Sequence, residues 1–403
     1  MQTGKKRPIL KINKWKNFCL FLLLLLSMFF TSGCWNRIEV NNTMEAEGIV
    51  FDLENGQPSF SVQLASPSTP DQSGSSQGSR PFNISGTGRT YTEAARKVMV
   101  FLPRLPLWAH AGVVIIGQDL ANTDIARATD FIGRNRNLRK TSLLFISKGV
   151  TGKECLEAEL PMESYSLPGL RKLIKIQESQ LGIYDPITLD DFLEYLATPG
   201  IQPAVPQVTI QEIEGKKVLR LDGTAVFKDR KLVGSLNETE SQGYRFLNPR
   251  MVTGGLIIIQ SPLANVPESD KMVSIELTRS QAITKPVFEE GNLKKISISI
   301  DAEGNFYEQT FTGEILSMEM INKMNELIEE KIKEEISASI KKAQLLDSDI
   351  FGWGRSIYRS NPDLWDQIEN DWPDIFPGIQ TAITVNFEIR RTYLLDKSFE
   401  FKE

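Results

Sequence analysis

The segment AGVVIIGQDLANTDIARATDFIGRNRNLRKTSLLFIS (residues 111–147) decides the fold class of this chain. It opens with a continuous apolar run, Ala111–Gly117, that is typical of a buried strand. Thr123–Arg134 then spaces its apolar residues as one helix face, and Thr141–Ser147 is a second buried strand. A strand–helix–strand order predicts two parallel strands joined by a right-handed helical crossover, in a partly parallel sheet with helices on its faces.

The residues before this segment extend the same sheet. Glu47–Asp52 and Ser59–Leu64 read as strands around Glu54-Asn55-Gly56, which is a strong hairpin signal. Ser66–Arg80 is rich in Ser, Gly, Pro and Gln and predicts a surface loop. Thr90-x-x-Glu93 is a capping box that opens a helix.

The residues after it predict helices and then a break. A short helix is capped at Thr151, and Pro168–Leu181 and Leu189–Leu196 predict two longer ones. Thr198–Pro206 interrupts the pattern with three prolines and a glycine, and we place a domain boundary there.

The second half alternates strands and then forms one long helix. The helix is expected from about Glu314 to Leu346, with an apolar residue every four positions between Met324 and Ile340. Strands followed by a long helix suggest an antiparallel sheet covered on one face. The strands are expected at Val218–Phe227, Lys231–Leu236, Leu256–Ile259, Met272–Leu277, Ile296–Ile300 and Ala382–Tyr393.

The predicted fold class is therefore α/β and α+β in a multi-domain chain. Residues 1–33 are expected to be a lipoprotein signal peptide. Residues 34–200 are expected to form a mixed-sheet α/β region, and residues 215–400 an α+β domain with an antiparallel sheet and one long helix.

The first 34 residues have the pattern of a lipoprotein leader. Six Lys and Arg side chains and no acid precede an apolar run from Phe18 to Phe30, which predicts a secretory signal. Cys34 after Thr31-Ser32-Gly33 resembles a bacterial lipobox, although Thr31 stands where an aliphatic residue is usual. We expect Cys34 to carry a diacylglycerol and the chain to lie on the extracytoplasmic side of a membrane. The alternative is a signal that stays uncleaved or is cleaved without lipidation.

The charge balance excludes one class of partner. Without residues 1–33 the chain keeps 40 basic and 51 acidic residues, a net charge near −11. Nucleic-acid-binding proteins need a basic face, so nucleic acid is not expected as a partner. The balance also argues against electrostatic adhesion to anionic lipid, so the acyl chains on Cys34 would have to hold the protein at the membrane.

The inventory of reactive side chains predicts no catalytic residue, no metal site and no cofactor. Cys155 is the single thiol beyond Cys34, which excludes an internal disulfide framework, and we interpret it as a core residue. His110 is the only histidine, which excludes zinc sites of the His/Cys kind. We interpret His110 as a packed or hydrogen-bonded structural residue rather than a member of a catalytic triad.

Three polar motifs allow both a structural and a functional interpretation. Ser85–Thr90 lacks the ending of a P-loop, so we interpret it as a turn that leads into a helix. Asp347-Ser348-Asp349 could suggest a metal pair, but capping of the following turn is the preferred interpretation. The acids between Asp363 and Asp374 alternate with Trp365 and Trp372, and we prefer aromatics packed inward to an amphipathic contact surface.

Several motifs together resemble the Ger(x)C family, the C-subunit lipoproteins of spore germinant receptors. Gly33–Glu39 matches the family start, with Asn36 in place of the common Asp. The similarity covers nearly all of the mature chain in the correct order. The most specific stretches are Asp222–Lys228 with Lys231–Gly234, Glu238–Glu240, and Asp347–Gly354 followed by Asn361-Pro362, Trp365 and Trp372.

The resemblance implies a non-catalytic, lipid-anchored subunit in the inner membrane of the bacterial spore. Its implied partners are the integral membrane A and B subunits of a germinant receptor, which responds to nutrients and starts germination. Direct binding of a small-molecule germinant by this subunit is not expected. The resemblance implies an architecture of three parts, so the region before Pro203 is expected to divide again, near 151–166. The interface residues are unknown from the sequence.

Two other classes of protein stay open. A solute-binding lipoprotein that captures a small nutrient for a membrane receptor or importer normally has two similar lobes, and the two halves here differ in type. A hydrolase needs a nucleophile and a base, and the chain has neither G-x-S-x-G nor a second histidine. A pair of acids could still act on glycans.

Overall fold

The computed structural model describes residues 14–29, 39–65, 81–261, 272–311 and 317–391. The chain forms two units, Met1–Thr43 and Met44–Glu403. The first contains helix α1 (Lys14–Phe29), which covers most of the apolar run of the expected leader, and the short η1 (Val40–Asn42). Among the described residues, no helix is both long enough and apolar enough to span a membrane.

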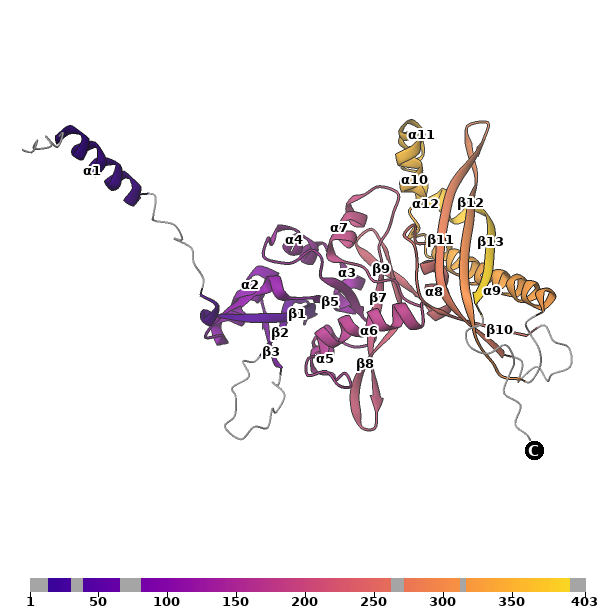
Figure 1. The fold of residues 1–403 in the computed structure, drawn as a ribbon, viewed down its shortest axis with the longest axis horizontal. Coiled ribbons are helices and arrows are strands. Elements are labelled where there is room, and N and C mark those ends of the chain that lie inside the picture. The colour runs from indigo at the N-terminus through magenta and orange to yellow at the C-terminus, as the bar shows by residue number, and fades with distance from the viewer. Residues whose placement is uncertain (1–13, 30–38, 66–80, 262–271, 312–316, 392–403) are drawn as a thin grey trace, which may run out of the picture. The chain divides into compact units, whose positions relative to one another are not determined.

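A mixed sheet of nine strands forms the first half of the second unit (Figure 1). Its strand order is β3-β2-β1-β5-β6-β7-β8-β9, and β4 pairs with β1. The central strands β1, β5, β6 and β7 run parallel, while the hairpins on both sides are antiparallel. The strands are β1 (Thr43–Glu54), β2 (Gln57–Leu64), β3 (Phe82–Thr87), β4 (Leu105–Leu107), β5 (Val113–Ile116), β6 (Leu143–Ser147), β7 (Ala204–Ile213), β8 (Lys216–Lys228) and β9 (Lys231–Leu236).

The strand–helix–strand unit predicted from residues 111–147 is confirmed. β5 and β6 pair in parallel, with Val113 opposite Leu143. The helix expected at Thr123–Arg134 is present as α4 (Ala126–Arg134), and a short helix that was not predicted, α3 (Gln118–Thr123), precedes it. The break falls at Asp124, whose backbone is extended and whose carboxylate accepts the N–H of Ala126 at 2.8 Å, so the helix restarts there.

The predicted first hairpin is also present. Glu54 pairs with Gln57, and the two residues between them, Asn55 and Gly56, have φ of 51° and 76°. Two successive residues with positive φ form the tight turn whose twist matches that of the flanking strands, which is why Asn-Gly occupies it.

Alternating side chains of the sheet enter two separate cores. Val114 and Ile116 pack under helices on one face, and Val113 and Ile115 pack under helices on the other. Both faces are therefore covered, as the parallel central strands require. The first face carries α2 (Tyr91–Val98), α3, α4 and α7 (Leu189–Ala197), with the short η2 (Met99–Phe101) and η3 (Trp108–His110), and the second carries α5 (Gly152–Glu157) and α6 (Ser166–Gln180).

The second half is a four-stranded sheet packed against helix α9 (Met318–Leu345). The predicted stripe of this helix is buried at every position from Met324 to Ile340 in steps of four. The sheet has the order β10 (Leu256–Gln260), β11 (Met272–Glu289), β12 (Asn292–Gln309) and β13 (Gln380–Arg391). The remaining helices are α8 (Glu238–Phe246), α10 (Trp353–Ser360), α11 (Pro362–Ile368), α12 (Trp372–Ile375) and η5 (Phe376–Gly378).

The fold class predicted from the sequence, mixed α/β followed by α+β with one long helix, is confirmed, and two details differ. β8 and β9 belong to the first sheet rather than the second, because each forms a hairpin with its chain neighbour, beginning at the Glu214-Gly215 turn. β13 is parallel to β12, because α9 to α12 form the long crossover that a parallel pair needs. The domain limits 34–200 and 215–400 and the split near 151–166 stay predictions, and the expected loop 66–80 lies outside the described residues.

Candidate functional site

The family-like motif that begins at Asp222 lies in β8 at a bulge of the first sheet. Asp222 and Gly223 face the single residue Gln207 of β7. Gly223 has φ of 93°, and a Cβ atom there would lie 2.7 Å from the carbonyl oxygen of Leu236, so glycine is required. The backbone N–H of Gly223 donates to Oη of Tyr184 at 3.0 Å, and burial raises the pKa of that phenol.

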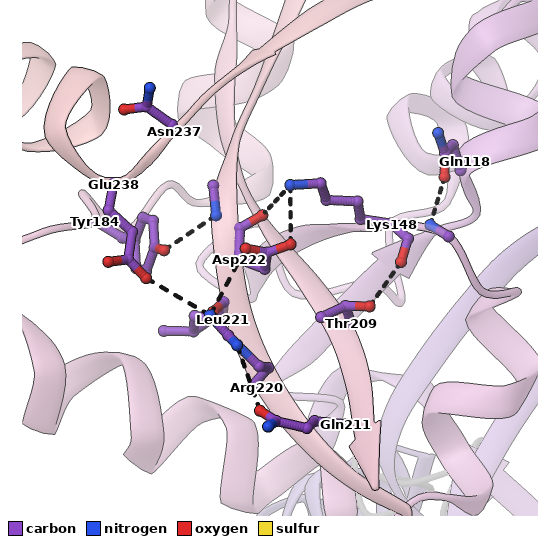
Figure 2. Close-up of polar contacts among 12 residues, drawn as sticks. Gln118, Lys148, Tyr184, Thr209, Gln211, Arg220, Leu221, Asp222, Asn237 and Glu238 are labelled. Atoms are coloured by element: carbon purple, nitrogen blue, oxygen red, sulfur yellow. Dashed lines mark hydrogen bonds and ion pairs between the residues drawn. The ribbon is translucent and has the colours of Figure 1, made fainter.

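The Asp222 carboxylate is the centre of a charged cluster (Figure 2). Nζ of Lys148 lies 2.9 Å from its Oδ2 and donates to the Asp222 carbonyl at 3.1 Å. Nη2 of Arg220 lies 3.8 Å from Oδ1 of Asp222 and 3.6 Å from Oε1 of Glu238 in α8. The cluster therefore joins the end of β6, the bulge of β8 and the first turn of α8.

Neighbouring polar groups hold the two cations of this cluster in place. The Lys148 carbonyl accepts from Oγ1 of Thr209 at 2.8 Å, and the N–H of Gly149 donates to Gln118 at 2.6 Å (Figure 2). Nη1 of Arg220 donates to Gln211 at 3.3 Å. These bonds fix the turn after β6 and the direction of the arginine side chain.

The chemistry available to this cluster is polar recognition. Its charges are partly exposed, 36% for the Lys148 side chain and 34% for Asp222, so solvent screens the ion pairs. Within the described residues, no group of three or more His, Cys, Asp or Glu side chains could hold a metal ion. We regard the Asp222 cluster as a candidate contact site for another protein.

The second family-like motif is organised by the buried carboxylate of Asp349. It accepts the N–H groups of Trp353 and Gly354 at 3.1 and 2.8 Å, at the start of α10. Burial raises the pKa of Asp349 to about 6, although these hydrogen bonds act in the opposite direction. The prediction that Asp347-Ser348-Asp349 caps the following turn is confirmed for Asp349, while Asp347 pairs with Lys228 at 3.8 Å.

The aromatic residues that follow face inward, as preferred from the sequence. Trp365 and Trp372 are 2% and 6% exposed, and their rings lie 5.5 Å apart. Phe376 lies against Trp372 and completes this aromatic group. The acids around them are exposed to solvent, whereas the two tryptophans are buried in the core.

The two reactive residues singled out in the sequence have different surroundings. Cys155 is fully buried in α5 and its pKa is raised by burial, which confirms the core interpretation. His110, which we interpreted as a packed or hydrogen-bonded structural residue, is not packed. Its side chain is 53% exposed, with Nδ1 3.9 Å from Oε1 of Glu45, because Trp108 fills the core position of the short η3.

The Ser85–Thr90 motif is only partly the predicted turn, because Ser85–Thr87 belong to strand β3 and Gly88–Thr90 alone form the bend that leads into α2. Oγ1 of Thr90 accepts the N–H of Glu93 at 3.2 Å and begins α2. A Cβ atom at Gly86 or Gly88 would lie within 2.7 Å of the Ala94 backbone, so both glycines serve close packing of strand and helix. Cys34, the expected lipid attachment site, lies outside the described residues, and its lipidation stays a prediction.

One cleft of small-molecule size lies near Asp349. Its volume is about 510 Å³, and it is lined by the loop 196–202, the turn 228–230 and parts of the segment 347–376. Both cations at its wall have partners: Lys228 pairs with Asp347, and Arg230 lies 3.6 Å from Asp124. The acids Asp229 and Glu369 also line it, so the cleft presents aromatic surface, paired cations and acidic side chains to a ligand.

Sequence reasoning missed Lys148 and Arg220 as members of the Asp222 cluster. Lys148 is 74 positions away from Asp222 in the chain, and only the pairing of β6, β7 and β8 brings them together. The one available signal was the Lys-Gly pair directly after a buried strand, where parallel α/β sheets often place functional side chains.

Comparison with known proteins matches both halves of the chain to one family. Residues 36–210 match the spore germination protein N-terminal domain, and residues 222–393 match the spore germination B3/GerAC-like C-terminal domain. The chain belongs to the Ger(x)C family of spore germination proteins.

Relatives in this family align with the chain over nearly its whole length. The putative spore germination protein YfkR of Bacillus subtilis (strain 168) is 23% identical over 94% of this chain and 97% of its own. Spore germination protein KC of the same strain is 24% identical over 93% and 96%. The crystal structure of the GerBC protein has a TM-score of 0.55 at 19% identity, covering 85% of this chain and 96% of that one, and so shares its fold.

Proposed function

We propose that this Ger(x)C protein is the lipid-anchored, non-catalytic C subunit of a nutrient germinant receptor. In this role it acts beside integral membrane A and B subunits on the extracytoplasmic side of the spore inner membrane. One observation carries the proposal: the family match begins at residue 36, two positions after the lipobox-like Cys34, and continues to residue 393. The expected anchor thus directly precedes the folded family sequence.

The mechanism follows from the short tether. Residues 34–43 can span at most about 30 Å, so a lipid on Cys34 would confine the folded body to a thin layer at the membrane surface. Within that layer, modest contacts with membrane-embedded subunits suffice, because the second binding event has a high effective concentration. The partly exposed charges around Asp222 suit such polar contacts.

The experiment is replacement of the anchor thiol. Cys34→Ala should abolish the acyl mass on the mature N-terminal residue, reduce the protein in the spore membrane fraction and weaken nutrient-triggered germination. Cys19→Ala, which removes the other thiol of the leader from an exposed position on α1, is the matched control and should change none of these. Normal membrane recovery and normal germination of Cys34→Ala spores would contradict the proposal.

The solute-binding alternative is kept because of the cleft near Asp349. Its volume of about 510 Å³ is in the range of small-molecule sites. Titration calorimetry with a panel of amino acids and sugars separates the two roles. Saturable binding of a compound that is lost in the Arg230→Glu variant, at the cleft wall, favours the solute-binding alternative. If no compound of the panel gives heat of binding, the result favours the receptor-subunit role.

A further inference from the structure

A positively charged segment lies within this acidic chain. Residues 81–142 contain nine Lys and Arg residues and four Asp and Glu residues, a net charge of +5, whereas the whole chain carries −5. Part of this charge flanks an apolar protrusion at the end of α2, which we name the 96–105 tip. Its exposed side chains are the cations Arg96, Lys97 and Arg104 and the apolar residues Val100, Phe101 and Leu105.

The apolar side chains of the 96–105 tip are strongly exposed. Val100 is 79% exposed, Phe101 67% and Leu105 44%. Single exposed apolar residues are ordinary on a protein surface. Three of them within six positions, with two cations before them and Arg104 between Phe101 and Leu105, form the pattern by which peripheral proteins enter the interface of a membrane.

The tip lies beside the point where the polypeptide enters the folded body. β4, which begins at Leu105, pairs with β1, and the N–H of Gly112 donates to the carbonyl of Glu47 at 3.2 Å. The segment after the tip therefore runs along the first residues of β1. β1 itself begins at Thr43, nine positions after Cys34 in the sequence.

The cationic surface continues from the tip along α2. Arg96, Lys97 and Val100 line a shallow depression that also contains Arg89 and Glu93. Arg89 and Lys97 both pair with Glu93, at 3.1 and 3.3 Å. Arg96, by contrast, has no ion-pair partner among the described residues, and one acid does not neutralise the three cations around it.

A second depression extends the same surface towards α4. It has a volume of about 890 Å³ and includes Arg89, Arg127, Arg134 and Arg136. Arg134 pairs with Asp130 at 2.8 Å, while Arg127 and Arg136 lack an ion-pair partner within the described part of the chain. Unpaired arginines at a surface are suited to phosphate groups, which they bind through two parallel hydrogen bonds.

We propose that the 96–105 tip docks on anionic phospholipid headgroups, with Val100 and Phe101 in the membrane interface and Arg96, Lys97 and Arg104 on the phosphates. The inference rests on the proposed function, because the lipid on Cys34 brings the tip to the membrane. Each cation near such a surface strengthens attraction about fivefold. An acyl tether alone leaves the body free to rotate, whereas tether and tip together define one face towards the bilayer.

Hydrogen exchange of the full-length lipid-modified protein on vesicles tests the proposal. Vesicles of phosphatidylcholine alone are compared with vesicles that also contain phosphatidylglycerol. On the anionic vesicles the peptide that covers 96–105 should exchange at least about fivefold more slowly, and 0.5 M salt should weaken this protection. The tip of the β11–β12 hairpin, Glu289–Asn292, should exchange equally on both kinds of vesicle.

Charge reversal supplies the matched variants. The triple variant Arg96→Glu, Lys97→Glu, Arg104→Glu should lose the protection, and Val100→Ser with Phe101→Ser should weaken it. Lys175→Glu, Lys217→Glu, Lys231→Glu changes the charge equally at other exposed positions and should retain it. All replaced side chains are exposed, so these variants are expected to fold.

The outcomes separate the two proposals. If the protein floats with the vesicles but residues 96–105 are not protected, the proposal for the 96–105 tip is overturned and the proposal of a lipid anchor still stands. Failure of the wild-type protein to float contradicts both. Protection that needs co-reconstituted integral subunits and is equal on uncharged vesicles identifies a protein as the occupant and overturns the lipid proposal.

Discussion

Oδ2 of Asp349 accepts a hydrogen bond from the indole Nε1 of Trp372 at 3.2 Å, across 23 positions of the chain. The same carboxylate accepts two backbone N–H groups at the start of α10. One buried charge thus connects α10 to α12 and closes the aromatic group against the second sheet. This arrangement explains why the segment from Asp347 to Trp372 carries so distinctive a sequence pattern.

Removal of this carboxylate should destabilise the fold strongly. Asp349→Ala leaves three buried donors, two N–H groups and the Trp372 indole, without a partner, and we expect the free energy of unfolding to fall by about 3 kcal/mol. Urea unfolding followed by tryptophan fluorescence measures the loss. Asp366→Ala, an exposed acid of α11, should change it by less than about 0.5 kcal/mol. Equal effects of the two variants would show that Asp349 does not organise this region.

A buried glutamate should make stability depend on pH. Burial in α9 raises the pKa of Glu335 from 4.5 to about 7, although Lys331, 3.4 Å away, partly opposes this. The folded state therefore binds the proton more tightly than the unfolded state. Protonation of Glu335 therefore contributes to the stability of the folded state. This stabilisation is fully present below pH 4.5 and is lost as the pH rises through 7.

Glu335→Gln mimics the protonated side chain and tests whether stability falls as the pH rises. The variant should match the wild type near pH 4.5 and exceed its free energy of unfolding by about 2 kcal/mol at pH 8. Urea titrations at pH 5, 6.5 and 8 measure the difference. Glu334→Gln, the exposed neighbour, should give a curve parallel to the wild type, and a parallel curve for Glu335→Gln would refute the expectation.

Two helical glycines should respond in opposite ways to alanine. A Cβ atom at Gly243 in α8 would lie 2.0 Å from the carbonyl oxygen of Glu335, so α8 and α9 must separate, and Gly243→Ala should lower the free energy of unfolding by about 2 to 3 kcal/mol. A Cβ atom at Gly133 in α4 would meet open space, and Gly133→Ala should raise the free energy of unfolding by roughly 0.5 to 1 kcal/mol. Thermal unfolding of both variants checks the signs.

The pair of Lys148 and Asp222 should show a measurable coupling. A double-mutant cycle with Lys148→Ala and Asp222→Ala is expected to give a coupling energy of about 1 kcal/mol, limited by solvent at these partly exposed side chains. The more exposed pair of Lys323 and Glu319 on α9, 3.1 Å apart, should give about 0.3 kcal/mol. Equal coupling energies in the two cycles would show that the Asp222 cluster is no more specific than an ordinary surface ion pair.

Local pattern was sufficient for most of the elements. The Asn55-Gly56 turn, the Thr90 N-cap of α2 and the four-residue stripe of α9 each depend on neighbours within a few positions, and each was predicted correctly. The full capping box expected at Thr90 is not formed, because the Glu93 carboxylate accepts the N–H of Arg89 instead of that of Thr90. The inward position of Trp365 and Trp372 was predicted for the same reason, since exposed acids alternate with them.

The errors arose where contacts are distant in the chain. A short strand of mixed polarity such as β9 has the same pattern in either sheet, and its sheet is decided by which strand it pairs with. The direction of β13 depends on the whole crossover from α9 to α12. The exposure of His110 depends on Trp108, which occupies the nearby core.

The sequence by itself determined most of the elements, the order of the two halves and the family, because periodicity, caps and motifs are properties of short stretches. Only the tertiary structure decided which strands share a sheet, how Lys148 meets Asp222, and that the cations and apolar residues of the 96–105 tip remain exposed beside β1. Pairing and burial depend on residues tens of positions apart, and the free energy of such contacts exists only once the chain has folded.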